Sequence, residues 1–461
     1  MPPTLHIDGL PIPQRYLAIL AIALGIVMAV MDSAIANVAL PTIGLDLHAD
    51  PAASIWIVNG YQLAVTVSLL PLAALGDIIG YRRVYIAGLI LFTVASLLCA
   101  LSTSVPMLAV ARMVQGFGGA GIMSVNSALI RFIYPHSQLG RGLSYNTLTV
   151  AVSAAAGPTV AAAILSLGTW PWLFAVNIPF GFVAVAVALR ALPHSPRAGH
   201  AFDIPGAVLV ALLFGVLIAS IDAFGHGESL LLFAVEIAAT AAIGWAMVRR
   251  EHETAAPMLP IDLMRIPQFA LAIATSICSF VGQMLALVSL PFLFQSGMKF
   301  TAVETGLLIT PWPIAIALVS PIAGRLADRH SAGLLGGFGL IVFAAGLLSL
   351  AFLPAQPGVF DIVWRMALAG IGFGFFQAPN ARAMIGAAPI TRSGGASGML
   401  GTARLLGQTI GASLVALVFL RLPLHGTVTS LYLGAGFAIL AAAVSSLRLF
   451  GSTGTGAKSQ S

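Results

Sequence analysis

The chain has 461 residues, of which 59% are hydrophobic and only 8% are charged. Soluble domains carry about 25% charged residues, so this composition excludes a soluble fold, and the abundance of large apolar residues excludes a disordered chain. A polytopic membrane protein remains, because uncharged apolar runs of about 20 residues span a bilayer. Two cysteines are too few for a disulfide framework or a metal cluster, so neither a metal site nor a redox cofactor is expected.

Apolar runs predict fourteen membrane-spanning helices and an all-α fold. The first eight lie near residues 17–40, 54–75, 84–103, 106–130, 143–166, 170–190, 206–224 and 229–248. The last six lie near residues 269–293, 305–325, 333–353, 361–383, 395–419 and 430–448. The first run is too long for a signal peptide and lacks a small-residue cleavage site, so it is expected to be retained as a span.

Basic residues support this number of spans and predict an orientation. If the N-terminus is cytoplasmic, most of the 21 Lys and Arg residues fall in inner loops, Arg325 and Arg448 among them, and only Lys299 and Arg421 fall in outer loops. Cytoplasmic loops of membrane proteins carry such an excess. We therefore predict a multi-pass protein of the cell (inner/plasma) membrane with both termini cytoplasmic. The net charge of +6 then reflects topology, and no nucleic-acid partner is expected.

Two predicted inner loops have related sequences. The loop after the second span carries Asp77, Gly80, Arg82 and Arg83, and the loop after the tenth carries Asp328 and Arg329. If the seventh and eighth spans are an insert, these loops occupy equivalent positions in two six-helix halves, as is typical of secondary transporters. The predicted domains are an N-terminal six-helix bundle over 1–200, a two-helix insert over 201–260, a C-terminal six-helix bundle over 261–450 and a disordered cytoplasmic tail over 451–461.

Four further segments carry recognisable motifs: 31–41 with Asp32, 112–120 beginning Arg-Met-Val-Gln-Gly, 170–181 beginning Trp-Pro-Trp, and 398–411 with Arg404. With these motifs the chain resembles the major facilitator superfamily, and within it the fourteen-span drug/proton antiporters of the EmrB/QacA kind. The resemblance covers essentially the whole chain. It implies two six-helix bundles plus two inserted helices, and export of drugs in exchange for protons by alternating access.

Ionisable side chains at bilayer depth are costly and are therefore candidates for function. Asp32 is expected about 12 Å below the outer end of the first span, and Arg112 about 9 Å below the outer end of the fourth, so the two can pair. We predict that Asp32 carries the proton and that Arg112 tunes its proton affinity. A permanent structural ion pair that locks two helices is the alternative.

Three other charged residues fall inside predicted spans. Glu236, in the eighth span, is a further candidate for proton coupling, although a partner-facing or snorkelling carboxylate explains it equally well. Arg365 and Arg404 have no obvious acidic neighbour in the sequence. They are expected either to bond helix carbonyls at a tight crossing or to take part in gating or in contact with an anionic group.

The related inner loops predict a latch between the two halves. Asp77 can accept hydrogen bonds from a helix N-terminus of the neighbouring bundle, while Arg82 and Arg83 can pair with carboxylates or lipid phosphates. Gly80 permits a tight turn. We expect Asp328 and Arg329 to belong to the corresponding device in the second half. A purely topological role of the basic residues is the alternative.

The fifth span contains Gly157 followed by Pro158. Proline removes a backbone donor and permits a bend, which would help to seal the pathway of an antiporter. A simple packing kink is the alternative.

The transport cavity is expected to be apolar and aromatic, because aromatic faces attract organic cations and flexible Met side chains suit varied shapes. The candidate lining residues are Trp56, Asn59, Tyr61, Gln62, Asn126, Gln283, Met284, Trp312, Gln377 and Asn380. No acid is apparent well inside a span of the second half, so monocationic or neutral compounds fit better than dications.

The sequence thus predicts a proton-coupled multidrug efflux antiporter that exports lipophilic compounds. A major facilitator transporter of one dedicated solute (a lipid, metabolite or siderophore), working by export or symport, is the alternative. An enzyme is not expected, because the spans offer no cluster of nucleophile, base or metal ligands. No cofactor is expected. Because the sequence contains no P-loop motif for binding ATP, the proton gradient is expected to drive transport. The expected partners are the lipid bilayer, small lipophilic substrates and protons, with no obligate protein partner.

Overall fold

The computed structural model describes residues 9–135, 138–195, 202–225, 229–251, 261–327, 329–354, 356–388 and 393–450. Within these ranges all regular structure is helical. The first part of the chain forms α1 (Gln14–Asp46), α2 (Pro51–Ile79), α3 (Tyr81–Ala100), α4 (Val105–Ser124), α5 (Asn126–Ile133), α6 (Leu139–Leu167), α7 (Pro171–Ala175) and α8 (Asn177–Ala191). Then follow α9 (Ile204–Gly225) and α10 (Leu230–Glu251).

The last part forms the 3₁₀-helix η2 (Ile261–Arg265), α11 (Pro267–Phe292), the π-helical η3 (Leu293–Gly297), α12 (Ala302–Ile309), α13 (Pro311–Leu326), α14 (Ala332–Ala351), α15 (Val359–Ala387), α16 (Ser393–Arg421) and α17 (Gly426–Phe450). In the described chain, thirteen helical segments are long and apolar enough to cross a membrane. The predicted seventh span corresponds to α9, of which Ile204–Leu217 is a shorter apolar helix.

Three predicted spans are interrupted in the structure, and a fourth ends in a turn of a different helix type. The fourth divides into α4 and α5 at Val125, the sixth into α7 and α8 at Val176, and the tenth into α12 and α13 at Thr310. The last break has a local cause, because Pro311 and Pro313 supply no backbone N–H to the preceding turn. The ninth span ends in the π-helical turn η3. These breaks lie inside apolar runs, so hydropathy alone does not show them.

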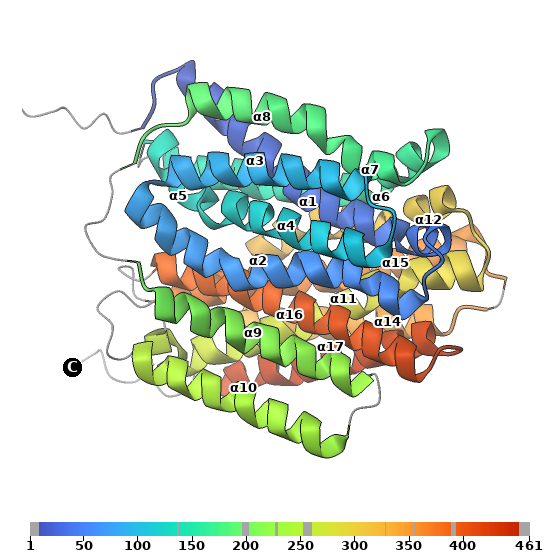
Figure 1. The fold of residues 1–461 in the computed structure, drawn as a ribbon. Helices are drawn as coiled ribbons and strands as arrows, with labels where there is room; N and C mark the ends of the chain where they lie inside the picture. Colours follow the sequence, from blue (N-terminus) through green and yellow to red (C-terminus); the bar gives the residue numbers. More distant parts are fainter. Residues whose placement is uncertain are drawn as a thin grey trace, which may run out of the picture.

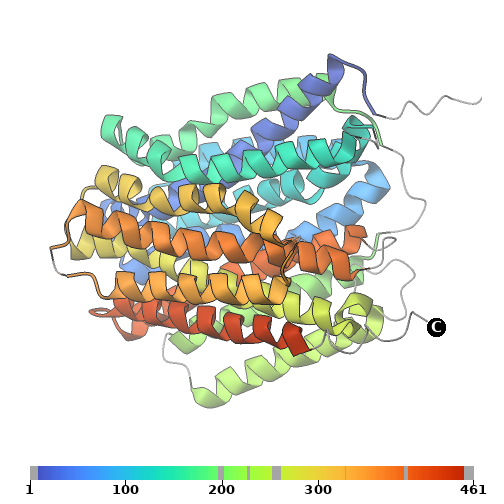
Figure 2. The ribbon, with the colours of Figure 1, turned by 180° about the vertical axis from the view of Figure 1, so that it is seen from behind.

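The long helices lie side by side in one bundle (Figure 1). Helices α1 to α8 occupy one side and α11 to α17 the other, as the reverse view also shows (Figure 2). The pair α9 and α10 lies along one edge, where α9 packs against α10, α2 and α16. The two sides are joined where α6 packs against α12, α2 against α16, and α1 against α11.

Several hydrogen bonds join the two sides of the bundle. They lie toward the predicted outer side and near the middle of the membrane. Gln295 accepts a bond from the Thr42 hydroxyl at 3.0 Å and donates to the Val38 carbonyl at 2.9 Å. The hydroxyls of Thr159 and Thr310 lie 2.9 Å apart, linking α6 to the α12–α13 break. A second threonine pair connects the middles of α2 and α16.

Candidate functional site

A buried ion pair lies between α1 and α4. Asp32 and Arg112 are 2% and 1% exposed, and Nη1 of Arg112 contacts Oδ2 of Asp32. The structure thus brings together the two charged residues that the sequence predicts at similar depth. Burial of both charges strengthens their attraction, but it also removes them from water, so each depends on the other for compensation.

Gln115 and Asn177 add hydrogen bonds to this pair, and Ser96 in turn bonds Gln115. Asp32 Oδ1 accepts bonds from Gln115 Nε2 at 3.0 Å and from Asn177 Nδ2 at 2.7 Å. Gln115 Oε1 lies 2.5 Å from Arg112 Nη1, and its amide nitrogen also donates to the Ser96 hydroxyl at 2.9 Å. The carboxylate therefore joins α1 to α4 and to the start of α8.

Arg112 has further partners besides Asp32. Its Nε donates to the Ile57 carbonyl of α2 at 3.2 Å. The guanidinium carbon lies 4.3 Å from the centre of the Tyr61 ring and 5.5 Å from that of Phe174, which favours cation–π contact. If Asp32 took up a proton, Arg112 would keep Gln115, the Ile57 carbonyl and the Tyr61 ring. The site can therefore accommodate the charged and the protonated carboxyl group, because the Arg112 guanidinium keeps hydrogen-bond acceptors in both states.

Asp32 lies farther from the end of its helix than the sequence predicts. The expected depth of about 12 Å assumed that the first span ends at Leu40, whereas α1 continues to Asp46. On the helical rise, Asp32 lies about 21 Å from that end. Arg112 lies about 10 Å from the start of α4 at Val105, close to the expected value. The two side chains nevertheless meet in the structure.

Sequence reasoning gave no role to Gln115, Asn177 or Ser96, although the first two lie within the motifs that carry the resemblance. A partial signal exists for Gln115, because residues three apart on a helix share a face and it follows Arg112 at that spacing. Asn177 and Ser96 come from other helices, so no spacing in the sequence shows that they meet Asp32.

Glu236 lies apart from this site. Helix α10 packs on α9 at the edge of the bundle (Figure 1), and the described structure places no contact between Glu236 and Asp32. Its Oε2 atom is buried without a hydrogen-bond partner among the described residues. A coupling role for Glu236 stays a prediction.

The predicted latch residues bond within their own half of the molecule. Asp77 accepts a hydrogen bond from the Tyr81 hydroxyl. Arg82 contacts His194 Nε2 at 2.7 Å and donates to the Leu189 carbonyl. In the described chain, neither residue bonds to the second half, so the latch stays a prediction for another conformation.

The remaining loop residues are less engaged. Gly80 has φ +100°, a left-handed conformation that favours glycine, and it allows α3 to begin one residue after α2 has ended. Arg83 and Arg329 are exposed. Asp328 lies outside the described residues.

Gly157 and Pro158 lie inside α6, where it crosses two other helices. A Cβ at Gly157 would collide with Ala34 of α1, two residues from Asp32. On another side, the Pro158 carbonyl packs so closely on Gly306 of α12 that a side chain there would not fit. This segment therefore sets the contact between the halves as well as the packing next to Asp32.

The predicted lining residues are scattered and mostly buried in helix contacts. Tyr61 covers Arg112, Trp312 packs edge-on against Phe343, and Asn126 donates to Asn146 at 2.7 Å. Asn380 donates to Ser276 at 2.7 Å. Of the rest, Asn59, Gln62, Gln283 and Met284 are buried, and Gln377 is half-buried.

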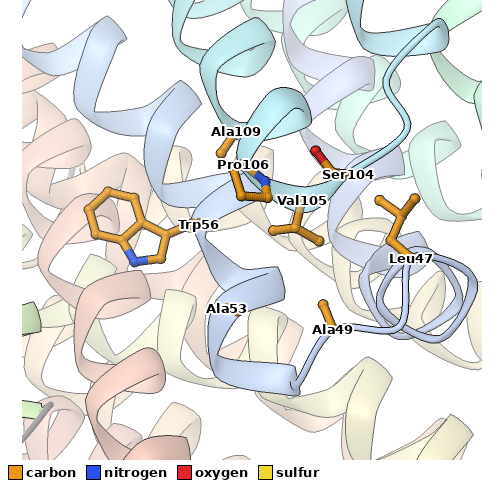
Figure 3. Close-up of a pocket in the computed structure, with 8 residues that line it drawn as sticks. All are labelled: Leu47, Ala49, Ala53, Trp56, Ser104, Val105, Pro106 and Ala109. Carbon is orange, nitrogen blue, oxygen red and sulfur yellow. The ribbon is translucent and has the colours of Figure 1, made fainter.

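Trp56 lines a pocket of about 380 Å³ near the predicted outer ends of α2 and α4 (Figure 3). Its other walls include Leu47, Ser104 and Ala109. Ala109 precedes Arg112 by about one helical turn, so the pocket lies above the ion pair and not around it. A lining role for all ten predicted residues stays a prediction.

Two arginines differ from their sequence-based description. Arg365 does have an acidic neighbour: Asp361, one turn earlier, forms an ion pair with it at 3.0 Å, and Arg365 also donates to the Ser349 carbonyl. Arg448 is not in an inner loop but near the end of α17, where it is 7% exposed and donates to Asn380 Oδ1 at 2.8 Å.

With this geometry in view, comparison with known proteins decides the family. A model described as Major Facilitator Superfamily matches residues 22–412. The chain belongs to the Major Facilitator Superfamily. It is accordingly a multi-pass membrane transporter of small molecules and not an enzyme.

Several relatives place this superfamily member more closely. "Uncharacterized transporter YebQ" of Escherichia coli (strain K12) is 56% identical over 449 residues, 97% of this chain and 98% of that protein. "Riboflavin transporter RibZ" of Clostridioides difficile (strain 630) is 26% identical over 408 residues, 88% of each chain. "Multidrug resistance protein Stp" of Mycobacterium tuberculosis (strain CDC 1551 / Oshkosh) is 30% identical over 408 residues, 88% of this chain and 76% of that protein.

A solved structure shows the same fold. The inward-facing, unoccupied structure of a bacterial homolog to the human lysosomal transporter Spinster superposes with a TM-score of 0.69. The match covers 95% of this chain and 97% of that one, at 15% sequence identity. This major facilitator fold is therefore shared across sequences that have diverged widely.

Proposed function

We propose that this transporter is a proton-coupled exporter of lipophilic compounds, of the fourteen-span drug/proton antiporter kind. It works by alternating access between two six-helix halves, α1–α8 and α11–α17, with α9 and α10 as an insert. It resides in the cell membrane with both termini cytoplasmic. The observation that carries this proposal is the buried carboxyl group of Asp32, held by Arg112 on one side and by neutral amides on the other.

A proton carrier must be able to lose its charge without collapse of the site. Arg112 has Gln115 Oε1 and the Ile57 carbonyl as acceptors that do not titrate, so protonation of Asp32 leaves it with partners. Because Asp32 also binds Asn177 at the start of α8, a change in its charge acts on three spans at once. This linkage supports a carboxyl group whose protonation biases the arrangement of the helices.

The contacts between the halves support alternating access. Gln295 bonds α1, Thr310 bonds α6, and Gly306 packs on Pro158, all toward the predicted outer side. We propose that these contacts break when the outer side opens. The loop with Asp77 and Arg82 would then engage the second half at the inner side.

The relatives support export of drugs, and the multidrug resistance protein Stp is similar over most of its length. Asp32 is already engaged by Arg112, so it is not available as one of two counter-ions for a dication. Lipophilic compounds with one charge or none fit this site.

A dedicated solute is the second candidate, and the similarity to riboflavin transporter RibZ favours it. The same proton site would serve it, and the two candidates differ only in the range of substrates. Breadth of selection across a compound panel therefore separates them.

Everted membrane vesicles that carry the protein and are energised with an acidic interior test the proposal. Addition of lipophilic dyes from a panel of anionic, neutral and monocationic compounds, with ethidium among the last, should release protons from the vesicles for the transported members with wild-type protein and not with Asp32→Asn. Asp361→Asn, at the outer end of α15, is the matched control and should behave as wild type. The absence of compound-linked proton movement across a broad panel would contradict drug/proton exchange and leave a dedicated solute.

A further inference from the structure

Arg404 lies near the middle of α16, and none of the residues that the structure describes pairs with its charge. The helix extends from Ser393 to Arg421, so the residue is far from either end. The side chain is half-buried, and its Nε atom is enclosed without a hydrogen-bond acceptor among the described residues. In that part of the chain it forms neither an ion pair nor a hydrogen bond.

Three other arginines, on α4, α15 and α17, do have acceptors. Arg112 has Asp32 and Gln115, Arg365 has Asp361, and Arg448 has Asn380 Oδ1 at 2.8 Å. Bonding to helix carbonyls at a tight crossing, which the sequence allows for Arg404, is therefore not what the described structure shows. A guanidinium at bilayer depth is costly unless something compensates it.

The position of Arg404 on α16 places it between the two halves. Gly401 lies against Leu69 of α2, and Thr409 bonds Thr66 of the same helix at 2.9 Å. Gly407 and Gly411, on a different face, pack against the backbone of α11. At about 100° per residue, Arg404 projects between these two faces. Transporters built from repeated halves bind their substrates at this kind of interface near the midplane.

Asp32 cannot serve as the counter-ion. It is occupied by Arg112 and by donors from Gln115 and Asn177. Arg404 instead lies within electrostatic range of the Tyr61 hydroxyl, whose ring is covered by Arg112 on another side. Because Arg112 already compensates Asp32, Arg404 adds a positive charge without an acidic partner to the described part of this interface.

We propose that Arg404 binds an anionic group of the transported compound, a carboxylate or a phosphate. The planar guanidinium can donate two parallel hydrogen bonds to such a group, and the half-buried amide of Gln408, one turn away on the same face, can add a third. The substrate class is then lipophilic organic anions, which differs from the monocationic compounds that the sequence favours. The assignment rests on the proposed export function, because it places the substrate between the halves.

Equilibrium binding to the purified protein in detergent, without a proton gradient, tests this site separately from transport. The probes are three anthracenes of nearly equal size: anthracene-9-carboxylate, its neutral methyl ester and the cationic 9-(aminomethyl)anthracene. Fluorescence anisotropy gives the three dissociation constants. Wild-type protein should bind the carboxylate at least about tenfold more tightly than the ester or the amine, as a charge-assisted hydrogen bond predicts.

The variants then locate the charge. Arg404→Gln should weaken carboxylate binding about ten- to a hundredfold and leave ester binding unchanged, whereas Arg404→Lys should keep part of the preference. Arg249→Gln, an exposed position on α10, removes an equal charge elsewhere and should bind all three probes as wild type does.

Two results would overturn the proposal: wild-type protein that binds the carboxylate no better than the ester, or Arg404→Gln that binds it as tightly as wild type. If Arg404→Gln no longer binds the ester either, the variant has lost its fold. The proposal is then tested by the ratio of the carboxylate and ester dissociation constants in wild-type protein and in Arg404→Lys. A loss of proton coupling in Asp32→Asn would leave these binding constants in place, so the two proposals fail separately.

Discussion

Asn177 Nδ2 lies 2.7 Å from Asp32 Oδ1, so the start of α8 is bonded to the carboxylate that α4 holds through Arg112. One side chain of α1 thereby connects the first, fourth and sixth predicted spans. Protonation of this carboxyl group would weaken its bond to the Arg112 guanidinium. It would also alter the hydrogen bonds that the carboxyl group accepts from the Gln115 and Asn177 amides. The geometry therefore links one proton to the mutual positions of three helices.

Removal of the cation from this pair should destabilise the protein strongly. Arg112→Gln leaves the Asp32 carboxylate buried without a counter-ion, which costs about 3–5 kcal/mol of unfolding free energy. Thermal unfolding of the purified protein in detergent measures this. The double variant Asp32→Asn with Arg112→Gln removes both charges and should recover most of the stability while remaining unable to couple protons. Wild-type stability in Arg112→Gln alone would show that the ion pair is not needed for the fold.

A cross-link between Thr159 and Thr310 should stop transport. Their hydroxyls are 2.9 Å apart, so cysteines at both positions are near enough to form a disulfide that holds α6 against the α12–α13 break. In a background with Cys278→Ser, oxidation should abolish transport and a reductant should restore it. Each single cysteine variant is the control. Undiminished transport by the oxidised double variant would mean that this contact does not open during the cycle.

Asn380 should matter for stability. Its amide donates to Ser276, and its carbonyl oxygen accepts from the buried Arg448, so α11, α15 and α17 meet at one side chain. Asn380→Ala leaves a buried guanidinium short of an acceptor and should lower the free energy of unfolding by about 1–3 kcal/mol. Gln377→Ala, half-buried on the same helix, should cost less. Equal losses in the two variants would argue against a special role for the Asn380 network.

The ion pair between Asp203 and Arg250, at the predicted inner ends of α9 and α10, should contribute little. Arg250 Nη2 and Asp203 Oδ1 are 2.8 Å apart, but the Arg250 side chain is 43% exposed. We therefore expect Asp203→Asn to change the free energy of unfolding by less than about 1 kcal/mol. Partial burial by itself would raise the pKa of Asp203, yet the Arg250 guanidinium and the Gly206 N–H leave it lowered from 3.8. This small stabilisation is therefore present above pH 3.8 and lost as the pH falls through the lower folded value. Chemical unfolding at pH 7 and pH 3 checks it.

The sequence predicts the positions of the long helices well, because a span needs a long apolar run whatever its neighbours are. Asp32 and Arg112 could also be paired in advance, since counting residues from the span ends places both in the outer part of the membrane. The ion pair of Asp361 and Arg365 was open to the same reasoning, because their spacing of four residues puts them on one helical face.

Other features depend on contacts that leave no mark in a single sequence. Asn177 meets Asp32 across two helices, and no periodicity connects them. An arginine near a helix end can reach the membrane surface or turn inward, and the sequence does not distinguish the two. Arg448 turns inward and bonds Asn380. Likewise, only the packing of α2 and α11 around α16 shows that Arg404 faces the interface, where the described residues give it no acceptor.

The most direct test of the central claim is the number of protons released when a transported compound binds to the purified protein. Calorimetric titration in two buffers of different ionisation enthalpy, with no membrane and no gradient, gives this number. Starting from protein whose Asp32 has taken up its proton, we predict a release of about one proton per bound molecule by wild-type protein and by Asp203→Asn, and none by Asp32→Asn, which should still bind the compound. Equal proton release by Asp32→Asn and wild type would contradict the assignment of Asp32 as the proton carrier.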